Sequence, residues 1–121
     1  KTTEIKCEFT ANPKDFVLDR ERATAIFRIF QESLTNIARH ANATRVKARL
    51  EAKSGVIALT IKDNGKGITK ELISDPKSFG LIGMRERALL WGGEVRITGV
   101  AGKETKVVVT IPLKSREKSD A

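Results

Sequence analysis

Residues 46–61 read Val-Lys-Ala-Arg-Leu-Glu-Ala-Lys-Ser-Gly-Val-Ile-Ala-Leu-Thr-Ile, and this stretch decides the fold. Apolar and charged residues alternate in its first half, and Ile57, Leu59 and Ile61 occupy every second position after Ser54-Gly55. Such alternation is typical of strands with one buried face. The stretch therefore predicts a β-hairpin whose charged side chains face water.

The segment before this hairpin, from Asp19 to about His40, has the spacing of an amphipathic helix. Asp19 is a suitable N-cap and Asn42 suits the helix exit. The apolar residues recur at steps of three and four, at Ile26, Ile29, Phe30, Leu34, Ile37, Ala38 and Ala41.

After the hairpin, residues 64–79 show little periodicity, and we expect a mobile loop that a compact domain keeps for a purpose. Helical spacing returns around Met84, Ala88 and Leu89 and stops at Gly92-Gly93. A second hairpin follows, with a turn near residues 99–104, and Pro112 indicates a strand that ends there or lies near a sheet edge. Its inward residues are Val95, Ile97, Val107, Val109, Ile111 and Leu113.

Residues 4–9 add a first strand, in which we expect Cys7 to be buried. The order of elements predicts an α+β fold, a two-layer α/β sandwich with a mixed, mostly antiparallel sheet and helices on one face. We expect one domain over residues 1–113 and a polar tail over residues 114–121.

Composition narrows the classes of function. The 121 residues carry a net charge of +8, but the basic residues are scattered without interleaved aromatic residues, so we expect no nucleic-acid partner and favour a nucleotide as the bound anion. A single cysteine excludes an internal disulfide. The chain begins with Lys1 and contains no long apolar run, so we expect an excised cytoplasmic fragment without membrane contact, whatever anchors the parent protein.

Two motifs suggest binding sites for the two ends of a nucleotide, its phosphates and its adenine base. Glu32, Asn36 and His40 are spaced by four and share one helix face, and an Asn oxygen suits Mg²⁺ that bridges phosphates. Asp63-Asn64-Gly65-Lys66-Gly67 follows a strand, where a carboxylate can accept a hydrogen bond from the adenine amine. The alternatives are the solvated side of a surface helix for the first motif and an ordinary turn for the second.

Two further motifs contain glycines. Gly80-Leu81-Ile82-Gly83-Met84 opens the second helix, where free backbone N–H groups form a natural phosphate cradle. Gly102-Lys103-Glu104-Thr105 precedes the last strand and offers a hydroxyl. Alone, each is also consistent with a glycine-rich helix start or a hairpin turn.

Together the four motifs, in this order, resemble the N, G1, G2 and G3 boxes of the GHKL, or Bergerat-fold, ATPases, and the resemblance covers residues 20–113. The segments Gln31-Glu32-Ser33-Leu34-Thr35-Asn36, Arg39-His40-Ala41 and Gly83-Met84-Arg85-Glu86-Arg87-Ala88 resemble the histidine kinases that phosphorylate NarL-type response regulators. The short stretch between Gly67 and Gly80 resembles their small ATP lid.

The resemblance implies a role for each matching residue. Asn36 would coordinate Mg²⁺, Asp63 would bind the adenine amino group, and Glu32 is a candidate base. Glu104 departs from the usual Gly-x-Gly-Thr and puts the role of Thr105 in doubt. The remaining ATP-binding residues would be Arg39, His40, Gly65, Gly67, Ile68, Gly80, Leu81, Gly83, Met84 and Thr105.

The implied activity is Mg²⁺-ATP binding and transfer of the γ-phosphoryl group to a histidine on a separate dimerisation domain, with a response regulator downstream. His40 lies in the nucleotide site, so we do not expect it to be the acceptor, and we expect low activity from the isolated chain. An anti-sigma-factor-type serine kinase or another GHKL ATPase are the alternatives.

Overall fold

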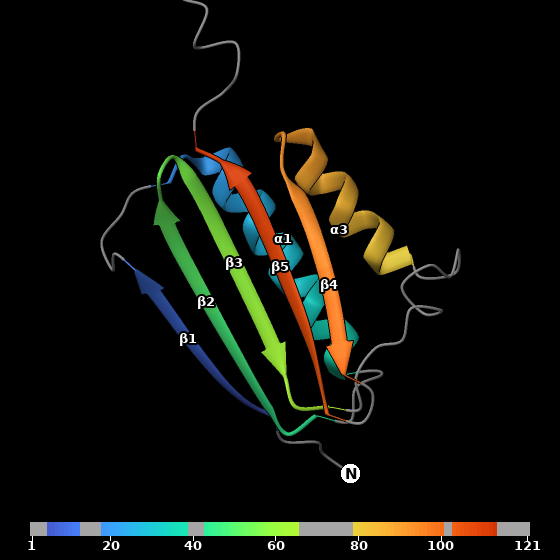
Figure 1. Ribbon diagram of the computed structural model, residues 1–121. Coiled ribbons are helices and arrows are strands. Elements are labelled where there is room, and N and C mark those ends of the chain that lie inside the picture. Colours follow the sequence, from blue (N-terminus) through green and yellow to red (C-terminus); the bar gives the residue numbers. More distant parts are fainter. Residues whose placement is uncertain (1–4, 13–17, 39–42, 66–78, 101–102, 114–121) are drawn as a thin grey trace, which may run out of the picture.

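Figure 1 shows a computed structural model of the chain, which describes residues 5–12, 18–38, 43–65, 79–100 and 103–113. Within these residues, five strands form one sheet in the order β1-β2-β3-β5-β4, and the two described helices cover one of its faces. The β1–β2 pair is parallel and the other pairs are antiparallel, which confirms the predicted mixed sheet. The elements are β1 (Lys6–Asn12), α1 (Arg20–Asn36), β2 (Arg45–Lys53), β3 (Val56–Asp63), α3 (Phe79–Leu90), β4 (Glu94–Val100) and β5 (Glu104–Pro112).

The first predicted hairpin is confirmed as β2–β3. Lys53 pairs with Val56, so the turn consists of the two residues between them, Ser54 with φ 55° and Gly55 with φ 78°. Positive φ at both positions is the geometry of a type I′ turn, whose twist matches that of the flanking strands.

The core lies between the inner face of the sheet and the two helices. Ile29 of α1 and Ala88 of α3 are fully buried, whereas Phe30 and Leu34 are only partly buried and Ala38 is exposed. The alternating strand residues predicted to face inward are buried at Val46, Ala48, Ile57, Leu59, Ile61, Val95, Ile97, Val107, Val109 and Ile111.

The N-terminus of α1 is fixed by Asp19 and Arg22. Asp19 is the N-cap and accepts a hydrogen bond from the Arg22 backbone N–H, as predicted. The buried Arg22 donates through Nε to the Pro112 carbonyl oxygen at 2.8 Å, and its guanidinium lies 4.9 Å from the Trp91 ring centroid. One arginine thus joins the start of α1 to the ends of β5 and α3.

The end of α3 is a glycine cap. The Gly92 N–H donates to the Leu89 oxygen and the Gly93 N–H to the Ala88 oxygen, the Schellman pattern, and Gly92 has the φ of 76° that this cap needs. A Cβ on Gly93 would overlap the backbone oxygen of Thr110, so the cap also brings the chain into close contact with β5.

Two expectations need correction, on Cys7 and on the bounds of the first strand. Cys7 is exposed because β1 is an edge strand. β1 contacts α1 through Phe9, whose ring centroid lies 5.8 Å from that of Phe30. β1 covers residues 6–12 instead of 4–9. Leu89 keeps the helical spacing of α3 but is 72% exposed, since Met84 and Ala88 take the buried positions. The predicted helix end at His40, the exit at Asn42 and most of the predicted loop lie outside the described residues.

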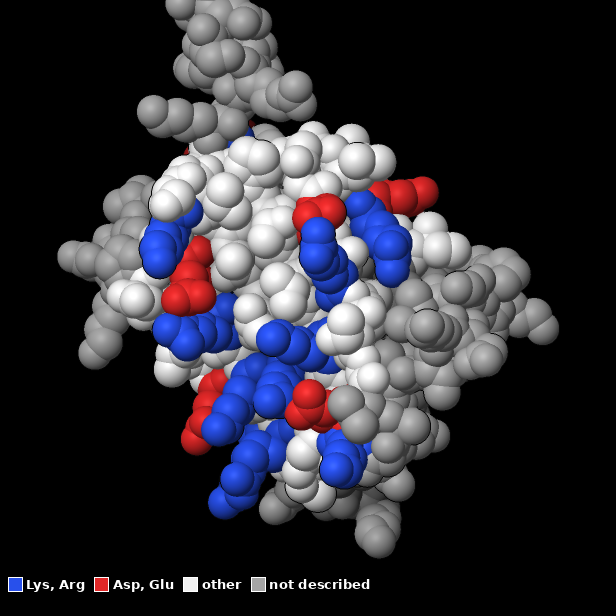
Figure 2. All heavy atoms as spheres, viewed as in Figure 1, with Lys and Arg blue, Asp and Glu red and all other residues white. Residues whose placement is uncertain are grey.

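The outer face of the sheet is charged. The strands lie in front of α1 in Figure 1, so Figure 2 views this face, and basic side chains gather over its lower part. Lys62 lies between Lys47 and Lys106 in the strand register and forms an ion pair of 3.3 Å with Glu104. The face is the water-exposed side that the alternating charges predict.

Candidate functional site

The site begins at Asp63, the last residue of β3. Its side chain faces the helix layer and the residue is only 4% exposed. Burial raises the pKa of this carboxyl, a hydrogen bond from the Gly65 N–H to Oδ1 at 2.8 Å opposes that shift, and the negative charge of Glu104 adds to it. Within the described residues no donor reaches Oδ2, so a ligand donor can bind there.

The strand register brings two predicted site residues together. Asp63 of β3 is the cross-strand partner of Thr105 of β5, and both side chains lie on the inner face. Glu104 precedes Thr105 and therefore lies on the outer face, where it pairs with Lys62. The glutamate that replaces the usual glycine thus does not point toward Asp63.

The motif in α1 meets the motif in α3 in the core. Ser33 is 3% exposed, and its hydroxyl donates to the Met84 sulfur at 3.2 Å. Glu32 and Asn36, on either side of Ser33 in the chain, are half-buried. α1 contacts both β3 and α3. In Figure 1 the last turn of α1 lies at the same end of the fold as the end of β3, where Asp63 stands.

The predicted phosphate cradle lies in the first turns of α3. Gly80 and Leu81 belong to the first turn, whose backbone N–H groups have no partner within a helix. A Cβ added to Gly83 would meet no atom of the described residues within 4 Å, so these residues leave the space beside it open. Met84 is 1% exposed, so its side chain belongs to the core between the two helices.

Some predicted residues cannot be placed. Arg39, His40, Gly67 and Ile68 lie outside the described residues. The part of the chain that the structure does describe holds no cluster of three or more His, Cys, Asp or Glu residues for a metal ion.

Sequence reasoning missed the roles of Ser33 and Asn64. A small polar residue on the apolar face of a helix, four residues from both Ile29 and Ile37, is the signal that could have identified Ser33 as buried. The Asn64 side chain accepts hydrogen bonds from the backbone N–H groups of Thr44 and Arg45. No local pattern indicates these partners, which lie 20 and 19 residues away.

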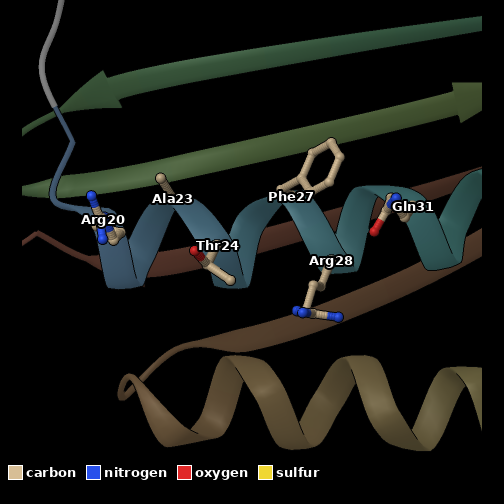
Figure 3. Close-up of a pocket in the computed structure, with 6 residues that line it drawn as sticks. All are labelled: Arg20, Ala23, Thr24, Phe27, Arg28 and Gln31. Carbon is tan, nitrogen blue, oxygen red and sulfur yellow. The ribbon is translucent and has the colours of Figure 1, made fainter.

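The groove in Figure 3 does not belong to this site. It has a volume of about 330 Å³ and lies along the first three turns of α1. It contains none of the predicted site residues and is lined by Arg20, Ala23, Thr24, Phe27, Arg28 and Gln31.

Comparison with known proteins agrees with this geometry. The profile of the family described as "Histidine kinase-, DNA gyrase B-, and HSP90-like ATPase" matches residues 21–115. The chain is 38% identical over 95 residues to the sensor histidine kinase LiaS of Bacillus subtilis, and 36% identical over 107 residues to the sensor protein VraS of Staphylococcus aureus. It superposes with a TM-score of 0.79 and 27% identity on the blue-light activated histidine kinase of Erythrobacter litoralis EL346.

These matches cover most of this chain and a small part of each relative. They include 78% of this chain and 26% of LiaS, 88% and 30% for VraS, and 98% and 38% for the Erythrobacter kinase. The chain thus spans about a quarter to a third of the curated relatives that it matches. Among the described residues, no helix has the length and apolar character needed to cross a membrane.

Proposed function

From the premise that this chain belongs to the family of histidine kinase-, DNA gyrase B- and HSP90-like ATPases, we propose that it binds Mg²⁺-ATP and donates the γ-phosphoryl group to a histidine on another domain. The observation that carries this proposal is the buried carboxylate of Asp63, whose Oδ1 is held by Gly65 while Oδ2 is free of donors from the described residues.

Asp63 recognises adenine through its exocyclic amine. A buried carboxylate oxygen is a strong acceptor, and a bond to a charged acceptor is worth about 1.5–3 kcal/mol. Gly65 lets the backbone approach the flat base, and Thr105 lies beside Asp63 with a hydroxyl on the same face. Gly67 and Ile68, which lie outside the described residues, complete the proposed set of residues on the adenine side.

The phosphates lie between α1 and the first turn of α3. The N–H groups near Gly80 and Leu81 donate hydrogen bonds to phosphate oxygens, and the open space beside Gly83 leaves room for these oxygens. Asn36 would hold Mg²⁺ through its amide oxygen, and Arg39 and His40, which lie outside the described residues, would contact phosphate. Glu32 is a candidate base on the same helix.

In the transfer step, a nitrogen lone pair of the acceptor histidine attacks the γ-phosphorus in line with the leaving oxygen. The new P–N bond forms as the bond to the β–γ bridging oxygen breaks, and ADP leaves. Binding and charge neutralisation are the tasks of this chain. The acceptor belongs to the dimerisation domain of the parent protein, and a cytoplasmic response regulator receives the phosphoryl group next.

The test is a titration of the purified chain with ATP, with and without Mg²⁺. Asp63→Asn is expected to lower ATP affinity by about 10- to 150-fold, because it removes the charged acceptor of the hydrogen bond from the adenine amine, which is worth about 1.5–3 kcal/mol. Asn36→Ala is expected to remove only the Mg²⁺-dependent part of the affinity.

Glu51→Gln is the matched control. Glu51 lies on the outer face of the sheet, paired with Arg49, so loss of its charge should not alter ATP affinity. An unchanged affinity in Asp63→Asn would remove the adenine assignment. Strong autophosphorylation of the isolated chain, lost in a His40→Ala variant that still binds ATP, would show that the acceptor lies in this chain after all.

A further inference from the structure

Asn64 lies between Asp63 and Gly65, but its side chain bonds to a different strand. Its Oδ1 accepts from the backbone N–H of Thr44 at 3.0 Å and from that of Arg45 at 2.9 Å. Its Nδ2 donates to the Thr44 hydroxyl at 3.0 Å, and its own backbone N–H donates to the Arg45 oxygen at 3.2 Å. Asn64 thus ties the chain just beyond β3 to the start of β2.

Burial does not demand these bonds. Asn64 is exposed, and water could satisfy its amide equally well. The bonds matter for geometry, because Val46–Asp63 is the last residue pair of the β2–β3 ladder. A terminal ladder pair frays unless something beyond it holds the strands together. The Asn64 amide occupies that place and extends the pairing by one position.

We propose that Asn64 is a positioning residue for adenine recognition, acting through the Asn64–Thr44 latch, the set of bonds described above. The inference rests on the proposed function of Asp63. The latch holds the turn in which the Gly65 N–H reaches Asp63 Oδ1 at 2.8 Å. With Oδ1 held, the carboxylate keeps one orientation and Oδ2 stays directed at the amine of the base.

A frayed turn would have a selective effect. The carboxylate would rotate and the amine contact would weaken, whereas the phosphate contacts on α1 and α3 would remain. The affinity for a base with an exocyclic amine should therefore fall more than the affinity for the same nucleotide without it.

The experiment compares ATP with purine riboside triphosphate, which lacks the exocyclic amine, as ligands of the purified chain in Mg²⁺. The wild-type chain is expected to prefer ATP by at least about tenfold, the effect of one hydrogen bond to a charged acceptor. Asn64→Leu removes every side-chain bond of the latch and should reduce this preference to less than about threefold, a loss comparable to a neutral hydrogen bond.

Three further variants sharpen the result. Asn64→Asp keeps an acceptor for both backbone N–H groups and can accept from the Thr44 hydroxyl, so it should restore most of the preference. Thr44→Val removes a single bond and should give an intermediate value. Asn12→Ala, which changes an exposed asparagine at the end of β1, should leave the preference unchanged.

The outcomes separate the two hypotheses. If the wild-type chain does not distinguish the two nucleotides, the adenine role of Asp63 fails and the latch with it. If the wild type does distinguish them and folded Asn64→Leu weakens both equally, the latch is structural only. Should Asn64→Leu not fold, Thr44→Val decides, because an unchanged preference in that variant overturns the positioning role.

Discussion

Replacing Gly83 with alanine should make the fold more stable and ATP binding weaker. Gly83 is the fifth residue of α3, and a Cβ there would meet no atom within 4 Å. Alanine is favoured over glycine in a helix interior by about 0.8–1.0 kcal/mol. With an unfolding entropy of about 2.1 cal/mol/K per residue, a gain of about 1 kcal/mol raises the Tm of this chain by about 4 °C.

The effect on ATP has the opposite sign. The open space beside Gly83 is where we place a phosphate oxygen, and a methyl group there prevents its approach to the backbone. Loss of one charge-assisted hydrogen bond costs about 1.5–3 kcal/mol, which lowers ATP affinity by about 10- to 150-fold. A general loss of folding cannot produce this combination, because the variant is the more stable protein.

The assay pairs thermal unfolding, followed by circular dichroism, with ATP titration in Mg²⁺. Thr24→Ala, an exposed position on α1, is the control that should gain helix stability and keep wild-type ATP affinity. Wild-type ATP affinity in Gly83→Ala would refute the phosphate cradle. A lower Tm would refute the inference that the helix has room for a methyl group.

Gly93→Ala should destabilise the fold by about 3 kcal/mol in urea denaturation, since the added methyl overlaps the Thr110 oxygen; a cost below about 1 kcal/mol would show that the β5 contact is loose. Arg22→Met should lower the free energy of unfolding by about 2 kcal/mol in the same assay, whereas Arg49→Met, at an exposed position, should lower it by less than about 0.5 kcal/mol. Equal losses in the two variants would contradict the anchoring role of Arg22. Burial raises the pKa of Asp63 above its ordinary 3.8, so the folded chain holds this proton more tightly than the unfolded chain. The unfolding free energy should therefore fall as pH rises from 3.8 through the raised pKa, and Asp63→Asn should flatten that slope; an unchanged slope would assign it to other groups.

The sequence by itself determined the elements and their faces. Alternation with period two and helical spacing are properties of neighbouring residues, so they predicted both hairpins, both helices and the buried residues from Val46 to Ile61. The Asp19 cap and the Gly92-Gly93 stop are local signals as well. The four motifs, in their order along the chain, resembled the boxes of a known family, and the family match over residues 21–115 confirms that resemblance.

Only the tertiary structure decided which distant residues meet. β5 lies between β3 and β4, and this order sets Asp63 opposite Thr105. The packing of α1 on α3 buries Ser33 against Met84, and the edge position of β1 leaves Cys7 exposed. Asn64 has an ordinary turn sequence and gains its role from its hydrogen bonds to Thr44 and Arg45. Such contacts depend on pairing between segments far apart in the chain, and the free energy of that pairing is shared over the whole sheet and both helices. No local sequence pattern therefore predicts which distant residues pair.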